Sequence, residues 1–270
     1  MTNKQPTMVE GIPCYAPEKM FQNEGFNPGD FELLYKLEEK NFWFRVRNKI
    51  IKHFVKLFVN KGNGAKFLEI GCGNAYVLKG LMDLPGLELK GSEIYLNGVK
   101  HAKDRLPEVE FMQIDATEMP FKNTFDGIGA FDVLEHIEED EKVMEQVKNS
   151  LKPGGVFVIT VPQYPWMWTY LDNQACHKRR YTRSELKQKL ERNGFDIVYF
   201  GSFVTLLFPI QMLSRFLMKN KKPESAGGEL DLPSPINAIC FALMYLDYLL
   251  IRIGARLPFG GSLLCVAQKI

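Results

Sequence analysis

The sequence predicts an α/β protein with a central parallel sheet, on three observations. Between residues 65 and 203, short apolar runs alternate with segments of helical periodicity, which is the order expected of βαβ units. A glycine-rich turn follows the first run, and acidic residues follow the next ones. The composition is that of a globular chain, with 46% hydrophobic and 24% charged residues.

Length and charge exclude several classes of protein. The 270 residues suffice for one large domain with an addition, or for two small domains. A disordered chain, a collagen-like chain and a disulfide-rich mini-domain are excluded by the composition. The net charge of +2 gives no general reason to expect binding to nucleic acid or to an anionic membrane.

The first sixty residues precede the alternating pattern. Prolines and glycines within residues 1–30 predict an irregular arm. Apolar residues at helical spacing predict one or two helices over 31–59, and the glycines at 61–64 then break the chain. We therefore expect residues 1–60 to form an arm with helices, and 61–203 to form the ligand-binding α/β domain.

The remaining elements follow from apolar runs and turn residues. The predicted strands are 66–70, 88–93, 109–114, 127–133, 156–161, 195–203 and 262–270. The predicted helices between them are 75–82, 96–106 and 138–151, with a stop and turn at 152–155. Thr182 and Glu185 form a capping-box pattern that opens a further helix, which Asn193-Gly194 closes.

An insert at 204–261 separates the last two strands, where a hairpin would need only a few residues. It holds two apolar segments, 206–218 and 236–253, joined by a polar linker. One interpretation is a helical pair that grips a lipid-linked or other apolar ligand, or that docks at a membrane. Basic residues would assist docking, namely Arg215, Lys219, Lys221 and Lys222. The other interpretation is a pair that packs on the sheet or forms a dimer interface.

Cysteine and histidine usage bears on compartment and metals. The five cysteines and four histidines are dispersed without a Cys-x-x-Cys pair. We therefore expect neither a metal site nor a disulfide framework, and a reducing cytoplasm fits. The polar N-terminus predicts no signal peptide. Asp247 and Arg252 interrupt the apolar segment 236–253, so we do not expect it to span a membrane.

The glycine-rich turn at 71–74 follows a predicted strand and opens a predicted helix. Gly71 and Gly73 let the backbone approach a ligand closely, and the helix start offers free amide donors. By itself, a tight turn without a ligand explains this pattern equally well. Glu93 ends the next strand, at the position where an acid accepts hydrogen bonds from both ribose hydroxyls of a nucleoside.

Two further acidic elements follow the third and fourth strands. Asp115-Ala116 closes the third strand, where a carboxylate reaches an exocyclic amine. Phe131 and Asp132 lie at the exit of the fourth strand, followed by Glu135. Because the carboxyl ends of parallel strands meet at one edge of an open sheet, these elements predict one ligand site.

With these residues the chain resembles the class I S-adenosylmethionine-dependent methyltransferases, and most of all the methyltransferase type 11 (UbiE/UbiG-like) family. The shared pattern is Glu-x-Gly-x-Gly, an acidic strand end, Asp-Ala, Asp-x-x-Glu-His and Leu-Lys-Pro-Gly-Gly, over residues 42–203. The resemblance implies a Rossmann-like sheet of seven strands with helices on both faces. The last strand is antiparallel, lies between the fifth and sixth, and follows the helical insert.

The resemblance also implies S-adenosyl-L-methionine as cofactor, with S-adenosyl-L-homocysteine as product. Expected cofactor contacts are Arg47, Glu69, Gly71, Gly73, Asn74, Glu93, Ile94, Asp115, Ala116, Phe131 and Asp132. Glu69 and the two glycines surround the methionine part, Glu93 holds the ribose, and Asp115 with Ala116 holds the adenine. In the aromatic segment 41–47, we favour Arg47 over Arg45 as the partner of the cofactor carboxylate.

On the acceptor side, His136 is a candidate general base if its pKa lies near the ordinary value, and equally a residue that only shapes the loop. The basic segment 176–192 follows an aromatic loop, a pairing that suits an acceptor with an apolar body and an anionic group. Expected substrate contacts are Trp43, Tyr164, His177, Arg179, Arg180 and Tyr181. The acidic segment 132–145 is predicted to be mostly a solvated helix face.

The sequence thus predicts a cytoplasmic methyltransferase that acts on an oxygen or nitrogen of a small, lipid-linked or glycan-linked acceptor, with no nucleic-acid partner. Peripheral membrane contact through 204–261 and a homodimer both stay open. A nicotinamide-dependent oxidoreductase is one alternative, which Tyr76 disfavours because it replaces the third glycine of a dinucleotide-binding turn. A non-catalytic cofactor-binding scaffold is the other.

Overall fold

The computed structural model describes residues 5–21, 28–59, 62, 64–218 and 232–270, so Lys219, Lys221 and Lys222 of the linker lie outside the described residues. The strands are β1 (Thr7–Val9), β2 (Ile12–Cys14), β3 (Ala65–Ile70), β4 (Leu87–Glu93), β5 (Glu110–Gln113), β6 (Phe125–Phe131), β7 (Leu151–Pro162), β8 (Phe195–Phe203) and β9 (Ser262–Lys269). The helices are α1 (Pro28–Leu37), α2 (Phe42–Phe58), α3 (Tyr76–Leu81), α4 (Leu96–Arg105), α5 (Asp140–Ser150), α6 (Tyr170–Gln174), α7 (Arg183–Arg192), α8 (Phe208–Met218) and α9 (Ser234–Arg252). Two 3-10 turns are η1 (Leu134–His136) and η2 (Pro165–Met167).

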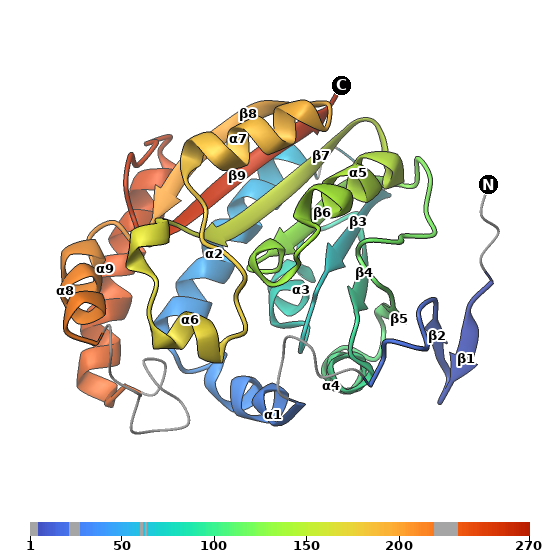
Figure 1. The fold of residues 1–270 in the computed structure, drawn as a ribbon, viewed down its shortest axis with the longest axis horizontal. Coiled ribbons are helices and arrows are strands. Elements are labelled where there is room, and N and C mark those ends of the chain that lie inside the picture. The colour runs from blue at the N-terminus through green and yellow to red at the C-terminus, as the bar shows by residue number, and fades with distance from the viewer. Residues whose placement is uncertain (1–4, 22–27, 60–61, 63, 219–231) are drawn as a thin grey trace.

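These strands form one mixed sheet in the order β1-β2-β5-β4-β3-β6-β7-β9-β8 (Figure 1). Strands β5, β4, β3, β6 and β7 pair in parallel, so their carboxyl ends share one edge. Strand β9 runs antiparallel to both β7 and β8 and lies between them. The α/β class and the inserted antiparallel last strand are confirmed.

The sheet has nine strands rather than the seven expected, because the N-terminal arm contributes two. The prediction of an irregular arm is wrong for residues 7–14, which form the hairpin β1–β2. Glu10 and Gly11 both have positive φ, of 50° and 74°, as in the type I′ turn that suits a two-residue hairpin. Pro13 obscured this signal because proline lacks an amide donor. Strand β2 joins the sheet where Cys14 pairs with Gln113 of β5.

The other expected elements match within a few residues, with one difference at 152–155. These residues were predicted as a stop and turn, and they lie within β7 instead. The register between β6 and β7 shifts between Phe125 and Gly127, so the irregularity is absorbed inside the pair of strands.

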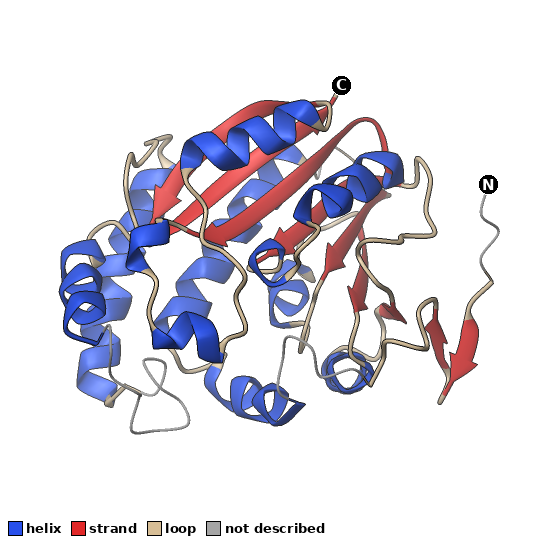
Figure 2. Cartoon of the chain, viewed as in Figure 1, coloured by secondary structure: helices blue, strands red, loops and turns tan. Residues whose placement is uncertain are grey.

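Helices cover both faces of the sheet (Figure 2). On one face, α2, α3, α4 and α9 bury a core that includes Ile50, Leu78 and Met244. On the other face, α5 and α7 bury a second core that includes Val143 and Leu186. The apolar residues that recur along α2 at helical spacing are the ones that face the sheet.

The two helices predicted for the insert are present as α8 and α9, at the end of the molecule opposite β1 and β2 (Figure 1). Helix α9 lies along α2, where the Asn237 side chain accepts from the Phe42 amide at 2.8 Å. The fully buried Asp247 of α9 accepts from the Thr205 amide at 2.6 Å and the Leu206 amide at 3.3 Å. These bonds fix α9 to the chain that leaves β8.

Candidate functional site

The turn after β3 has the shape of a ligand cradle. Gly71 has φ +62°, and a Cβ there would lie 2.5 Å from a Val133 methyl group, so glycine is required. Gly73 has φ +50°, and among the described residues no atom lies within 4 Å of the position of its Cβ. This open space is where a ligand can approach the backbone of the turn.

Glu93 at the end of β4 is fixed beside that turn. Its Oε2 accepts from the Gly73 amide at 3.1 Å, and its Oε1 accepts from the amides of Ile94 at 2.7 Å and Tyr95 at 3.2 Å. Burial raises the pKa of Glu93, and the three amides oppose that rise. Oε1 thus already accepts two hydrogen bonds, whereas Oε2 accepts one and has a lone pair left for a ribose hydroxyl.

Asp115 after β5 is held by its own loop and by the N-terminal arm. Its Oδ1 accepts from the amide and hydroxyl of Thr117 at 2.8 and 2.7 Å, and its Oδ2 forms an ion pair with Lys19. The arm itself is tied to β5, because the Gln113 side chain exchanges hydrogen bonds with the backbone of Ala16 at 3.0 and 2.8 Å. Lys19 was not predicted, and an adenine amine would share Asp115 with it.

Arg47 of α2 reaches the carboxyl end of β6. Its guanidinium lies 2.5 Å from Asp132 Oδ2, donates to the Phe131 carbonyl at 2.7 Å, and stacks 4.8 Å from the Trp43 ring centroid. Asp132 itself has φ +57°, a strained conformation for a residue other than glycine and one that clusters at functional sites. Arg45 instead stacks on Phe241 of α9, which agrees with the preference for Arg47.

Glu69 on β3 supplies a buried acceptor beside Arg47. It is 3% exposed, and its Oε2 receives no hydrogen bond from another described residue. Burial raises the pKa of Glu69 well above its ordinary value, and the charge of Arg47 partly offsets this. A buried acceptor without a donor is rare and suits a ligand that brings its own donor, such as the ammonium group of the methionine part.

Asn74 lies at the turn, and its side chain forms a hydrogen bond with the backbone of α1. Its amide donates to the Phe31 carbonyl of α1 at 2.9 Å. Arg105 of α4 donates to the Asn74 carbonyl at 2.9 Å and pairs with Glu38 at 2.6 Å. Asn74, Arg105 and Glu38 therefore hold α1 against the turn. Neither Arg105 nor Glu38 was predicted, because only the packing of α1 on α4 brings them together.

A cavity of about 550 Å³ lies between α1, α6, α8 and α9. It opens next to the edge of the sheet where the parallel strands end and the expected cofactor contacts lie, which we call the cofactor edge. Its buried end includes Asp132, Glu135 and Pro162, and its exposed end includes Ile210 and Ile236. Most of the wall between them is apolar, from Leu33, Leu34, Leu37, Phe42, Trp43, Leu171, Val204 and Leu207. Three of the expected substrate contacts line it, namely Trp43, His177 and Arg180.

Asp172 of α6 organises the polar part of the cavity wall. It is 1% exposed and accepts hydrogen bonds from Arg180 Nε at 2.7 Å and from the Thr169 amide at 2.8 Å. It also contacts His177 Nδ1 at 3.0 Å. Arg215 of α8 adds a second guanidinium at 3.5 Å. Burial tends to raise the pKa of Asp172, but these donors and charges outweigh it and lower the pKa well below its ordinary range.

Glu135 and His136 of η1 lie next to His177 at the buried end. Glu135 is fully buried, and neither carboxyl oxygen receives a hydrogen bond from another described residue. Burial, followed by the charge of Asp132, raises the pKa of Glu135 well above its ordinary value. Burial, followed by the charge of His177, lowers the pKa of His136 to about 3. The premise of a base near its ordinary pKa is therefore wrong for His136.

The same three side chains form a cluster that dispersed histidines did not predict. Atoms of Glu135, His136 and His177 that could bind a metal ion lie within 4.8 Å of one another, and the two imidazole rings meet edge to face. We expected no metal site because the sequence spacing has none. The chain folds these groups together from η1 and the segment after α6.

Comparison with known proteins decides the family. The family described as "Methyltransferase domain" matches residues 42–199, which is more than half of the chain. The chain belongs to this family. A probable S-adenosylmethionine-dependent methyltransferase of Mycolicibacterium smegmatis is 28% identical over 166 residues, 60% of this chain and 62% of that protein. The sterol 24-C-methyltransferase ERG6B of Gibberella zeae is 28% identical over 137 residues, 48% of this chain and 35% of that protein.

The matched part of the chain thus spans less than two thirds of the length of these relatives. Among solved structures, Haemonchus contortus phosphoethanolamine N-methyltransferase 2 in complex with S-adenosyl-L-methionine shares the fold, with a TM-score of 0.61 and 16% identity, over 97% of this chain and 61% of that one. The expected methyltransferase class and its S-adenosyl-L-methionine cofactor are confirmed. The insert lies outside the region that the family matches.

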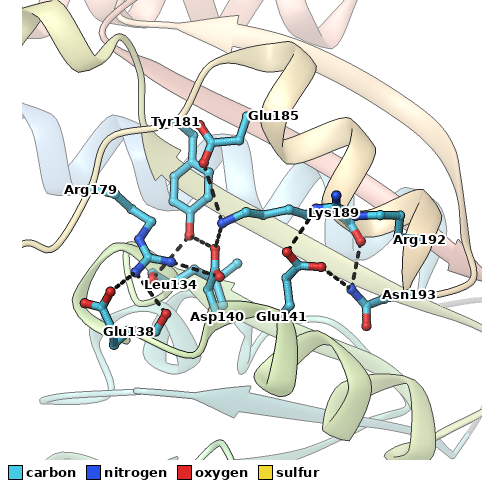
Figure 3. Close-up of polar contacts among 10 residues, drawn as sticks. All are labelled: Leu134, Glu138, Asp140, Glu141, Arg179, Tyr181, Glu185, Lys189, Arg192 and Asn193. Atoms are coloured by element: carbon cyan, nitrogen blue, oxygen red, sulfur yellow. Dashed lines mark hydrogen bonds and ion pairs between the residues drawn. The ribbon is translucent and has the colours of Figure 1, made fainter.

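In this methyltransferase domain, three expected substrate contacts lie away from the cavity. Arg179 pairs with Asp140 at 2.9 Å and the buried Tyr181 donates to Asp140 at 2.6 Å, so both join α5 to the segment before α7 (Figure 3). Tyr164 packs between Trp166 and Phe208, with ring centroids 5.4 Å from each. These residues are corrected from substrate contacts to packing contacts.

The charged segments are corrected with them. The acidic segment was predicted to be mostly a solvated helix face, and His177, Arg179, Arg180 and Tyr181 of the basic segment were expected to contact the substrate. Part of each segment binds the other, because Lys189 pairs with Asp140 at 2.6 Å and Arg192 pairs with Glu141 at 2.9 Å (Figure 3). Glu138 and Glu139 of the acidic segment are exposed, as predicted. Only Arg180 and His177 of the basic segment face the cavity.

Proposed function

We propose that the protein transfers the methyl group of S-adenosyl-L-methionine to an oxygen or nitrogen of an acceptor with an apolar body. The acceptor is a small molecule or is linked to a lipid or glycan. The observation that supports this most is the cavity, because it starts at Asp132 and Glu135, beside the strand ends of the cofactor edge, and is largely apolar from there outward.

The residues at the strand ends fit the cofactor. Glu93 would accept from the ribose hydroxyls, Asp115 from the adenine amine, and Glu69 with Arg47 would bind the charged methionine part. Gly71 and Gly73 leave the backbone free for close approach. When bound, the cofactor would supply an activated methyl group for an oxygen or nitrogen of the acceptor, and S-adenosyl-L-homocysteine would be the leaving group.

The cavity residues would act mainly by alignment and by exclusion of water. Methyl transfer is an in-line displacement, so a fixed geometry of acceptor and methyl group supplies much of the acceleration. The low pKa of His136 keeps its imidazole neutral, and in the proposal it shapes the pocket next to His177 rather than accepting a proton. Arg180 and Asp172 orient a polar group of the acceptor at the buried end.

Two rival functions find less support. A nicotinamide-dependent oxidoreductase is disfavoured by the antiparallel β9 between β7 and β8, the arrangement expected of methyltransferases and not of dinucleotide-binding sheets. A non-catalytic scaffold is disfavoured by the open cavity beside the cofactor edge. The name of the Gibberella zeae relative, a sterol methyltransferase, supports an apolar acceptor. Five free cysteines support a cytoplasmic location.

Titration calorimetry with S-adenosyl-L-homocysteine tests the cofactor site. We expect Glu93→Ala to weaken binding by about 1–3 kcal/mol, because buried donors lose their acceptor. Glu88→Ala is the matched control, since Glu88 is an exposed carboxylate on the same strand, and it should bind as the unchanged protein does. Equal affinity for both variants would remove Glu93 from the site, and no binding by the folded unchanged protein would refute the function.

Turnover tests the acceptor. The protein is incubated with a cell extract and a donor that carries a labelled methyl group, and the products are separated into organic and aqueous phases. We expect label in the organic phase. A folded protein that binds the cofactor and labels nothing would instead be a scaffold.

A further inference from the structure

The insert presents an apolar surface to solvent. We define the insert face as eight exposed apolar side chains on α8, on α9 and at the C-cap of α9, namely Ile210, Leu213, Phe216, Ile236, Ile239, Leu246, Leu250 and Ile253. Phe216 is 78% exposed, Ile239 62% and Ile253 81%. Scattered exposed apolar residues are ordinary, but a contiguous patch of large ones marks a binding surface.

Along α9, the exposed residues follow one stripe. Ile239, Leu246, Leu250 and Ile253 recur at helical spacing, so they share a side of the helix. The opposite side packs on the domain, because Met244, Asp247 and Ile251 are buried. Asn237 also bonds to the backbone of Lys40 and Phe42 at the start of α2. By length and composition α9 could cross a membrane, with 17% of its most apolar window buried. A helix fixed along one side to a soluble domain fits a membrane surface instead.

In the described parts of the insert, the exposed charged residues have one sign. In the described parts of the insert, 204–218 and 232–261, the charged residues are Arg215, Asp247, Arg252 and Arg256. Asp247 is fully buried, whereas Arg252 and Arg256 at the end of α9 are exposed. An apolar helical face with exposed arginines and no exposed acid in these segments complements an anionic bilayer surface.

The insert face is continuous with the cavity. Ile210 is 63% exposed and Ile236 is 49% exposed, and both line the cavity at its open end. Among the charged residues that line the cavity, Glu135, Asp172 and Arg180 are buried, and Asp132 and Arg215 are partly buried. A ligand that enters between α8 and α9 would therefore place a polar head at the cofactor edge and leave an apolar tail at the insert face.

We propose that the insert face docks the protein on an anionic bilayer surface, and that the acceptor is an amphipathic membrane lipid that enters head first between Ile210 and Ile236. This inference rests on the proposed methyl transfer for the identity of the ligand, but the docking itself does not depend on it. Docking keeps the lipid tail in an apolar environment while the head reaches the cofactor edge. It also accounts for large apolar side chains that cover nothing in the described chain.

Vesicle flotation tests the docking. Full-length protein is mixed with vesicles of phosphatidylcholine alone or with phosphatidylglycerol added, and the bound fraction is measured at two salt concentrations. We expect binding to the phosphatidylglycerol vesicles that weakens with salt. Ile239→Glu should lower the partition coefficient about tenfold, since it removes apolar burial and adds a charge that the surface repels.

Met8→Glu is the matched control, because Met8 is also 62% exposed and lies on β1 at the other end of the molecule (Figure 1). It should float as the unchanged protein does. Circular dichroism and calorimetry with S-adenosyl-L-homocysteine on the same samples confirm that each variant is folded and binds the cofactor. Loss of cofactor binding by the unchanged protein refutes the function, whereas intact cofactor binding without flotation refutes only the docking.

Two other results would overturn the docking. The first is equal flotation of Ile239→Glu and Met8→Glu, which would show that the insert face is not the contact. The second is a dimer in light scattering that Ile239→Glu dissociates, with no vesicle binding, which would assign the face to a second copy of the chain. Labelled lipid in the organic phase that decreases for Ile239→Glu but not for Met8→Glu would support lipid entry from the membrane.

Discussion

Two buried aspartates, Asp140 and Asp172, each gather cations, yet they serve different parts of the molecule. Asp140 is 3% exposed and binds Arg179, Lys189 and Tyr181, which joins α5 to α7 (Figure 3). Asp140 is not among the residues that line the cavity. Asp172 is 1% exposed and binds Arg180 and His177 on the cavity wall. Arg179 and Arg180 are neighbours in the sequence, yet Arg179 packs between helices and Arg180 lines the cavity.

The difference shows that a run of charged residues in a sequence does not reveal which way each side chain points or which residue it binds. Four residues of the basic segment 176–192 were expected to contact the substrate, but three of its cations, Arg179, Lys189 and Arg192, pair with Asp140 and Glu141 of α5. What distinguishes Arg180 is its partner on α6, which also contacts Arg215 of the insert. The Asp172 cluster therefore couples the cavity wall to the insert, whereas the Asp140 cluster couples two helices on one face of the sheet.

The largest effect is expected from Asp172→Asn. Loss of this charge leaves Arg180 buried without a counter-ion, and we expect the free energy of unfolding to fall by about 3–5 kcal/mol. Urea denaturation measures this, and labelled-methyl turnover should fall as well because Arg180 and His177 lose their orientation. Asp196→Asn, at an exposed position of β8, is the control. Equal stability of the two variants would contradict the central role of Asp172.

Asp140→Asn should have a smaller effect that is confined to stability. Its partners Arg179 and Lys189 are 18% and 14% exposed, so water can partly solvate them when the charge is removed. We expect the free energy of unfolding to fall by about 2 kcal/mol, with unchanged affinity for S-adenosyl-L-homocysteine. A loss of cofactor affinity in the folded variant would show that the two clusters are not separate.

The position of the expected strand-end cofactor contacts at one edge of the sheet was predictable from sequence, because each of them ends or follows its own strand. Glu93, Asp115 and Asp132 each end a strand that apolar runs and nearby turn residues define, so their common edge follows from the parallel sheet. The contacts of the Asp140 and Asp172 clusters and of the insert were not predictable in this way. Asp140 and Lys189 are 49 residues apart, and Phe42 and Asn237 are 195 apart, so these contacts depend on how helices pack. The β1–β2 hairpin was missed because Pro13 disguised a short strand.

Lowering the pH should reduce the difference in the free energy of unfolding between the unchanged protein and Asp140→Asn. Burial raises the pKa of Asp140, but the hydrogen bonds from Lys189 and Tyr181 outweigh it, so the pKa is lowered in the folded state. The stabilisation is therefore fully present above the unfolded-state pKa of about 3.9 and is lost as pH falls through the folded-state value. We expect unfolding curves of the two proteins to approach each other only below about pH 4. A gap that closes already between pH 7 and pH 5 would assign the stabilisation to another group.

The smallest effect is expected at the exposed rim of the Asp140 cluster. Arg192 and Glu141 lie 2.9 Å apart, but their side chains are 62% and 43% exposed, so water and salt screen the pair. We expect Arg192→Ala to lower the free energy of unfolding by about 0.5 kcal/mol or less, and the difference to vanish at high salt. Lys189 lies on the same helix, and its side chain is only 14% exposed. Lys189→Ala should lower the free energy of unfolding several times more than Arg192→Ala, because Asp140 is then left with fewer donors. An equal fall in the free energy of unfolding for the two variants would contradict this. It would mean that burial does not determine how much each cation contributes, and that the cations act through their summed charge.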